Sequence, residues 1–286
     1  MRVMQSLRTI LWVLLVLAVV PSPVKSQQVR PSIQESFGVG ELTLTGGAIL
    51  GLGVLSMWGG KWIGPDAASM GRPLEGSTDL RFSRWANPDF DPQTQWLGGV
   101  PDLGGYLAPA LGLGYYIGGS LIGGKSGYYG AYRHEAIAFT EALSWSMLTT
   151  VLLKRLVGRE RPYVARGHWG EIDASAVKMN HSEHLLSFPS GHSTAIAATT
   201  FFMAADLSDA LITGPLREST SWNKVLIGRV LPSVGASTLS WIVMYSRIKD
   251  QRHWLSDTLV GTAIGGISAL LSYHLHFDRH GQPYRR

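Results

Sequence analysis

The chain has 286 residues and a formal net charge of +5, enough length for one domain or at most two. It has no cysteine, which excludes disulfides, zinc–thiolate sites and cysteine nucleophiles and leaves His, Ser, Asp or Lys for covalent catalysis. Charged residues make up 16% of the chain and its mean hydropathy is +0.09, at the border between soluble and membrane proteins. The positive net charge suits an anionic ligand or an anionic membrane surface. The chain has no run of basic residues of the kind that indicates nucleic-acid binding.

The first 26 residues have the pattern of a secretory signal peptide. Arg2 and Arg8 give a positive start, and an apolar run of 12 residues follows from Thr9 to Val20. Because this run is short for a bilayer span, we expect cleavage before Gln27 and one mature domain over residues 27–286. The alternative is an uncleaved membrane anchor.

Six weakly apolar segments follow, and their lengths predict helices rather than strands. The glycine pairs Gly114 with Gly118 and Gly261 with Gly265 have the spacing that lets helices approach closely, especially in membranes. We therefore predict an all-α bundle of about six core helices, embedded in a membrane, with a soluble bundle as the alternative. Residues 61–100 are too rich in proline for long helices. The six segments are Leu42–Gly60, Leu103–Gly124, Ala136–Leu153, Ser193–Ala205, Leu231–Ser246 and Thr258–Phe277.

A first polar cluster lies at the end of the third segment. Arg161 lies seven positions after Lys154, which is close to two turns of a helix, so both side chains are predicted to share one face. Pro162 then disfavours further helix. Two convergent cations can hold an oxyanion, although basic residues at a helix end also simply satisfy its C-terminal carbonyls.

A second cluster, Phe188-Pro189-Ser190-Gly191-His192, precedes the fourth segment and predicts a turn into a helix start. Free N–H groups at a helix N-terminus suit phosphate, and Gly191 allows close backbone approach. Ser190 adds a hydroxyl donor, and His192 can protonate a leaving group. The alternative is an ordinary N-cap followed by an unrelated histidine.

A third cluster consists of Ser246 and Arg247, then His253, then Asp257. Asp257 lies four positions after His253, so on a helix they would share a face. A carboxylate bonded to one ring nitrogen fixes the tautomer and leaves the other nitrogen free to attack. Arg247 offers a bidentate fork for phosphate oxygens. A surface salt bridge is the alternative interpretation.

Lys-x6-Arg-Pro, Pro-Ser-Gly-His and Ser-Arg-x5-His-x3-Asp occur in this order and together resemble the signature of the type 2 phosphatidic acid phosphatase and vanadium haloperoxidase superfamily, over residues 135–273. The resemblance implies an all-α fold and phosphomonoester hydrolysis without a metal or other cofactor. It implies that His253 is the nucleophile that forms a phosphohistidine, that Asp257 orients it, and that His192 is the general acid. Phosphate would be bound by Lys154, Arg161, Ser190, Gly191 and Arg247.

The superfamily includes six-span lipid phosphatases, soluble periplasmic acid phosphatases and vanadate-dependent haloperoxidases, so three functions stay open. We expect a lipid phosphate or diphosphate as substrate and vanadate as an inhibitor, with a small phosphomonoester as the alternative substrate. Vanadate would be a cofactor only in a haloperoxidase. The resemblance places the protein in a bacterial cell envelope, in the membrane with its site facing the periplasm, or soluble in the periplasm. The motifs do not define the oligomeric state.

Other histidines are weaker candidates. His274, His276 and His280 near the C-terminus do not have the spacing of a standard metal site. His168, His181 and His184 lie in the insert before the second cluster, where a solvated loop is the simplest interpretation.

Overall fold

The computed structural model describes residues 39–57, 76–90, 103–122, 132–171 and 183–284. Within these ranges the chain is helical, with one isolated bridge between Phe277 and Pro283. The predicted signal peptide, residues 1–26, and its cleavage point before Gln27 lie outside the described residues.

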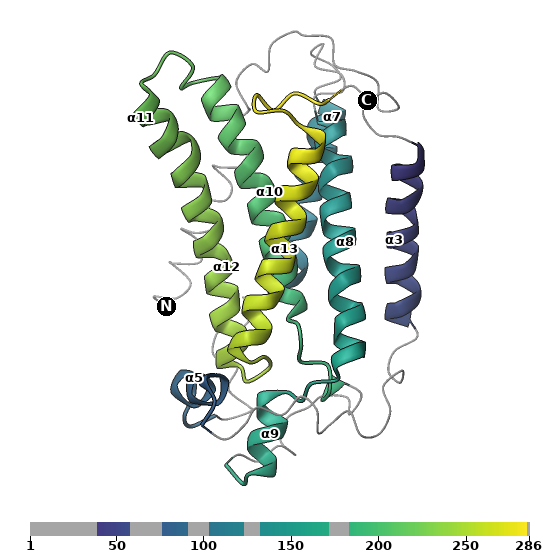
Figure 1. Ribbon diagram of the computed structural model, residues 1–286, viewed down its shortest axis with the longest axis vertical. Helices are drawn as coiled ribbons and strands as arrows, with labels where there is room; N and C mark the ends of the chain where they lie inside the picture. Colours follow the sequence, from purple (N-terminus) through teal and green to yellow (C-terminus); the bar gives the residue numbers. More distant parts are fainter. Residues whose placement is uncertain (1–38, 58–75, 91–102, 123–131, 172–182, 285–286) are drawn as a thin grey trace.

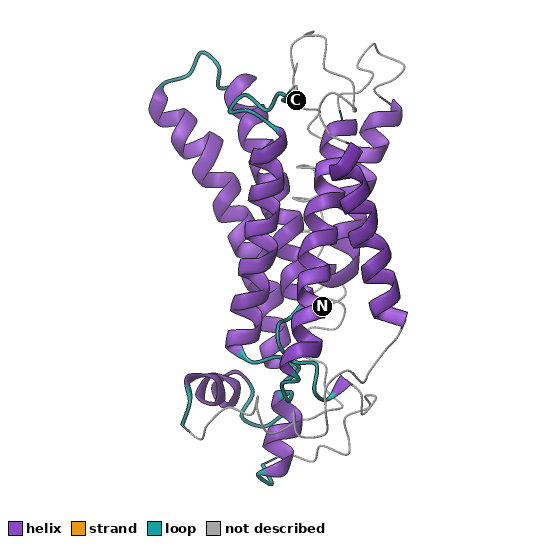
Figure 2. Cartoon of the chain, turned by 45° about the vertical axis from the view of Figure 1, so that its right-hand side comes forward, coloured by secondary structure: helices purple, strands orange, loops and turns teal. Residues whose placement is uncertain are grey.

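All six predicted segments are helices that run side by side along one long axis (Figure 1), which confirms the all-α prediction. In the described part of the proline-rich stretch there is one short helix, α5 (Thr78–Ala86). It lies with another short helix, α9 (Pro162–His168), at the same end of the bundle (Figures 1 and 2). The long elements are α3 (Val39–Met57), η1 (Leu103–Leu107) with α7 (Ala108–Ile122), α8 (Arg133–Val157), α10 (Gly191–Thr213), η5 (Lys224–Val230) with α12 (Leu231–Lys249), and α13 (Leu255–His276); a short α11 (Ser221–Asn223) precedes η5.

Four helical stretches of the described chain are long and apolar enough to cross a membrane. Large apolar side chains are exposed on their outer faces, among them Leu231 at 62%, Trp241 at 48% and Ile267 at 58%. A soluble bundle turns polar residues outward, so these exposed apolar faces fit a membrane-embedded bundle better than a soluble one. The four stretches are Arg133–His168, Gly191–Thr213, Ser221–Lys249 and Leu255–His276; Val39–Leu55 is a shorter apolar helix.

Helix α10 is the centre of the bundle and packs against α13, α12 and α8. Gly261 and Gly265 let α13 approach it closely, because a Cβ at Gly261 would lie 2.5 Å from the Ser190 carbonyl oxygen, and one at Gly265 would overlap the Thr194 carbonyl. The predicted role of this glycine pair is therefore correct. Gly114 and Gly118 face open space instead, so the same prediction is wrong for α7.

Candidate active site

The three polar clusters meet at one end of the bundle, where α8 and α12 end and α10 and α13 begin (Figure 1). The start of α13 is joined to the start of α10 by a hydrogen bond from the Ser190 N–H to the Asp257 carbonyl, 3.0 Å long. The glycine contact at Gly261 lies one turn further along α13. Close packing of these two helices therefore fixes the second and third clusters relative to each other.

The first cluster does not share one helix face, contrary to the sequence prediction. Helix α8 ends at Val157 because Gly158 adopts a left-handed conformation, with φ of 59°, and caps it. Arg161 is the N-cap of α9, and Pro162 starts that helix instead of ending one. Lys154 and Arg161 still reach the same site, but from two different helices.

Both cations are held by backbone carbonyls of the loop that precedes α10. Lys154 Nζ donates to the Leu186 carbonyl at 2.8 Å, and Arg161 Nε donates to the Glu183 carbonyl at 2.8 Å. A second Arg161 nitrogen donates to the carbonyl of Arg252 at 3.0 Å. These bonds fix the position of each cation without neutralising its charge, which leaves the charge available for an anion.

The second cluster forms the start of α10, as its residues predicted. Ser190 is the N-cap, and its Oγ accepts from the Ser193 backbone N–H at 3.4 Å. A Cβ built on Gly191 would lie 3.9 Å from Lys154 Cε, so the Gly191 backbone faces the lysine stem. The first N–H groups of a helix have no intrahelical acceptor, and here they lie beside a cation. This arrangement suits a phosphate group.

His253 is buried, at 2% exposure, and lies just before α13 rather than on it. Its Nδ1 is 2.7 Å from the Ser187 carbonyl oxygen, whereas the nearest Asp257 oxygen is 3.8 Å away. A carbonyl can only accept, so Nδ1 carries the proton and Nε2 keeps a free electron pair. The direct partner that sets the tautomer is therefore a backbone carbonyl, and the predicted bond from Asp257 is not made.

Burial holds the pKa of His253 well below its ordinary value. Positive charge on Lys154, Arg161 and Arg247 lowers that pKa further. Residues of the first and third clusters thus act on this one imidazole and favour its neutral form. The Arg247 carbonyl also accepts the His253 N–H at 3.3 Å, which joins the end of α12 to the histidine.

Asp257 acts on the loop around His253 rather than on the ring. Its carboxylate accepts from the Ser187 hydroxyl at 2.5 Å, from the Trp254 N–H at 2.9 Å and from Arg159 at 2.6 Å. The Ser187 carbonyl contacts the His253 ring, and Trp254 follows His253 in the sequence. Asp257 is therefore a positioning residue, because it fixes both the carbonyl that binds Nδ1 and the backbone that carries the ring.

Arg159 is a residue of this network that the motifs did not indicate. It donates 2.6 Å bonds to Asp257 and to the Ser256 hydroxyl, and a 2.7 Å bond to Asp79 of α5. Burial would raise the pKa of Asp79, but hydrogen bonds from Ser256 and Arg159 outweigh burial and lower it. Helix α5 is thereby fastened to the start of α13 by a charged side chain.

Gln251 supplies a second link between α5 and the candidate catalytic loop, residues 250–254 between α12 and α13. It has a left-handed backbone, with φ of 54°, which turns the chain from α12 toward His253. Its buried side chain accepts from the Ser83 hydroxyl at 2.6 Å and donates to the Ser83 carbonyl at 3.0 Å. Arg166 of α9 also donates to Gln251, at 3.1 Å. The short helices thus support the site from outside the bundle.

His192 lies on the first turn of α10 and is packed by η1. Its ring meets the edge of Tyr106 with centroids 5.6 Å apart. A Cβ on Gly105 would overlap the imidazole, so only a glycine allows η1 to lie this close to the ring. The imidazole of His192 is therefore positioned by its packing against η1.

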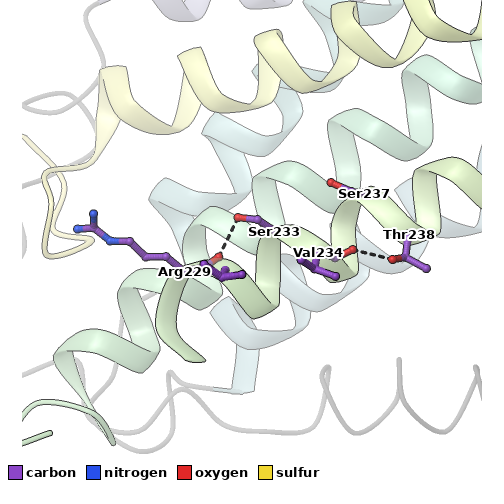
Figure 3. Close-up of a pocket in the computed structure, with 6 residues that line it drawn as sticks. Arg229, Ser233, Val234, Ser237 and Thr238 are labelled. Atoms are coloured by element: carbon purple, nitrogen blue, oxygen red, sulfur yellow. Dashed lines mark hydrogen bonds between the residues drawn. The ribbon is translucent and has the colours of Figure 1, made fainter. Parts of the chain in front are cut away.

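A surface hollow on α12 is separate from this site. Arg229, Ser233, Ser237 and Thr238 are among the residues that line it (Figure 3). The Ser233 and Thr238 hydroxyls donate to carbonyls one turn back on the same helix, each at 2.8 Å. Since none of the motif residues lines it, the hollow has no part in the proposed chemistry.

The remaining histidines lie apart from the catalytic loop or on its rim. His184 is a neighbour of Tyr163, with ring centroids 5.6 Å apart, and its carbonyl accepts the Arg161 N–H. His168 is exposed and 3.6 Å from Glu160. His181 lies outside the described residues, and His276 contacts two glutamates at the other end of the bundle.

Comparison with known proteins identifies the family of the chain. The sequence matches the PAP2 superfamily over residues 135–280, slightly more than half of the chain. The chain therefore belongs to the PAP2 superfamily, the family in which the three motifs placed it.

Two curated relatives are named as phosphatases or as related to them. The chain is 28% identical over 191 residues to a PA-phosphatase related-family protein of Dictyostelium discoideum, and this match covers 67% of the chain and 62% of the relative. It is 30% identical over 160 residues to phospholipid phosphatase 1 of Rattus norvegicus, covering 51% of the chain and 54% of the relative. The chain thus spans little more than half the length of these relatives.

The structure is also similar to a crystal structure of a transmembrane PAP2-type phosphatidylglycerolphosphate phosphatase from Bacillus subtilis. The two share 20% sequence identity with a TM-score of 0.49, over 80% of this chain and 93% of that chain.

Proposed function

We propose that this chain is a metal-independent phosphatase that hydrolyses lipid phosphates or diphosphates through a phosphohistidine intermediate. The observation that carries the proposal is the state of His253. Its Nδ1 donates to the Ser187 carbonyl at 2.7 Å, so Nε2 is a neutral nucleophile in a site surrounded by fixed cations. The PAP2 family membership supports the same reaction class.

In the proposed reaction, Nε2 of His253 attacks phosphorus and the bond from phosphorus to the leaving oxygen breaks. His192 donates a proton to that oxygen as it leaves. Water then attacks the phosphohistidine while His192 takes a proton from it, which releases inorganic phosphate and restores both histidines. Three cations and the α10 N-terminus stabilise the charge on the equatorial oxygens, the role that metal ions have elsewhere. The cations are Lys154, Arg161 and Arg247.

A lipid substrate is supported by the outer faces of the bundle. Four helical stretches can cross a membrane, and their outer surfaces carry large apolar side chains. Binding of an acyl chain remote from phosphorus can increase the rate of the chemical step. We also propose that the protein lies in a membrane with its site facing the periplasm. Protease access to the α5–α9 end, compared between intact and opened cells, tests this orientation.

The roles of the two histidines can be separated by leaving group. His192→Ala is expected to lose most activity on phosphatidic acid, whose leaving group needs a proton, and less on p-nitrophenyl phosphate, which needs little protonation. His253→Ala is expected to lose activity on both alike. His280→Ala, an exposed histidine far from the loop, is the matched control. Labelled phosphate that stays acid-labile and bound in His253→Ala, but not in His192→Ala, would mean that the roles are reversed.

The substrate class is tested by catalytic efficiency in mixed micelles. We expect kcat/KM for phosphatidic acid to exceed that for p-nitrophenyl phosphate by at least about tenfold, equivalent to ~1.4 kcal/mol of binding energy from the acyl chains. Equal efficiencies on the two substrates would instead indicate a non-specific acid phosphatase.

A further inference from the structure

Three side chains with metal-binding atoms converge at the end of the bundle opposite the three motifs. Glu41 lies in the first turn of α3, Glu141 lies on α8, and His276 is the last residue of α13 (Figure 1). His276 Nε2 is 2.6 Å from a Glu141 oxygen and 3.4 Å from a Glu41 oxygen. One ligand atom from each of the three lies within 4.8 Å of the others.

We propose that Glu41, Glu141 and His276 form a binding site for a divalent transition metal ion of the zinc class, separate from the phosphate chemistry. Imidazole nitrogen and carboxylate oxygen are both ligands that zinc takes in proteins. Ligands about 2.1 Å from a shared tetrahedral ion lie roughly 3.4 Å from one another. The His276–Glu41 separation of 3.4 Å already has this value, and the His276–Glu141 pair has to open by less than 1 Å.

The composition of the cluster suits a divalent cation. His276 is 2% exposed, and its imidazole lies between two carboxylates. A divalent cation with a neutral imidazole balances both carboxylates.

The location suggests what the ion would do. Helix α3 packs against α8 at the edge of the bundle, and few of its described side chains are buried, Thr45 and Ala48 among them. Near its other end, Arg155 of α8 donates to the Leu55 carbonyl. An ion bound by Glu41 together with Glu141 and His276 would fasten the start of α3 to both α8 and α13. The site is therefore structural, and its occupancy should affect stability rather than the rate of phosphate hydrolysis.

The test uses the full chain in detergent, stripped with a chelator and equilibrated with Zn²⁺ alone. We expect one zinc per chain by elemental analysis, and a rise in the unfolding midpoint of roughly 5 °C at a hundredfold excess over Kd. Glu141→Gln and His276→Gln are expected to lose both effects. His280→Gln, in the exposed tail, and His253→Gln, in the catalytic loop, are the controls that should keep them.

Wild-type protein that binds no stoichiometric zinc would overturn the proposal, since the cluster would then be a hydrogen-bonded pair with a neighbouring glutamate. Zinc that persists in Glu141→Gln and His276→Gln would also overturn it, because the ion would lie elsewhere. If those variants fail to fold, Glu41→Gln replaces the less buried ligand, and retention of tight zinc binding in Glu41→Gln counts against the site.

Discussion

Gly261→Ala adds one methyl group at the point where α13 meets the start of α10. The new Cβ would lie 2.5 Å from the Ser190 carbonyl oxygen and 3.2 Å from the Thr194 hydroxyl. Ordinary contact begins at 3.4 Å, so the backbone at Ser190 must move by about 0.9 Å. That carbonyl also accepts the Thr194 N–H at 3.0 Å and cannot turn aside without losing this bond, so the two helices have to separate.

Overpacking of this kind costs about 1–3 kcal/mol. The larger effect should be on activity, because a displacement near 1 Å in an active site can lower the rate about 100-fold. We expect Gly261→Ala to lose one to two orders of magnitude in kcat on p-nitrophenyl phosphate, together with a lower unfolding midpoint.

Gly114→Ala is the matched control, because a Cβ there meets nothing within 4 Å. It should keep wild-type kcat and equal or exceed wild-type stability, as alanine favours helix over glycine by up to ~1 kcal/mol. Gly261→Ala with unchanged kcat and midpoint would refute the argument that this contact positions the phosphate-binding turn. Equal damage from Gly114→Ala would show that the effect is not specific to the crossing.

Three further predictions concern the catalytic loop. Arg159→Met is expected to destabilise the protein by about 3–5 kcal/mol and to lower kcat, because it leaves Asp257 without its ion-pair partner. Thermal unfolding and rate assays should show that Arg159→Lys has smaller losses of both stability and kcat. Arg217→Met, at an exposed arginine, should cause neither loss. Since burial and nearby cations lower the pKa of His253 below 6.5, the unfolded chain binds that proton at a higher pH, so stability should fall as pH drops through about 6.5; His253→Gln should weaken this dependence of the unfolding midpoint on pH. Vanadate is expected to bind as a five-coordinate mimic of the transition state, and titration calorimetry should show binding lost in His253→Ala; unchanged affinity there would contradict the assignment of the nucleophile.

The all-α fold could be predicted because each helix is indicated by the length and composition of its own segment of sequence. Each apolar segment is long enough to be a helix and too long for a strand, and each appears as one. The end of α8 was predicted wrongly, although a signal was present. The spacing of Lys154 and Arg161 predicts a shared face only if one helix continues across Gly158, yet a glycine after an apolar turn is a common helix C-cap. Pro162 after that glycine fits the first position of a new helix.

Some features of the site had no sequence signal that one chain could provide. The acceptor for His253 is the carbonyl of Ser187, and a backbone carbonyl is present at every position, so no residue type marks it. Arg159 and Asp79 are 80 residues apart, and their pairing depends on where α5 folds back. The spacing from His253 identifies Asp257, but on a helix it predicts a carboxylate bonded to the ring, whereas Asp257 binds the loop around it.

The two ends of the bundle have opposite chemistry, and this makes chelation informative. At the motif end, Lys154, Arg161 and Arg247 lower the pKa of His253, so the positive charge that a phosphate needs comes from the chain itself. At the other end, Glu41 and Glu141 surround His276, and the positive charge has to come from outside. EDTA should therefore lower the unfolding midpoint of the wild type without changing kcat well below that midpoint. His276→Gln should be insensitive to EDTA in both measurements. Loss of kcat with EDTA at low temperature in both proteins would mean that a metal acts at the catalytic end, and the proposal of metal-independent hydrolysis would be wrong.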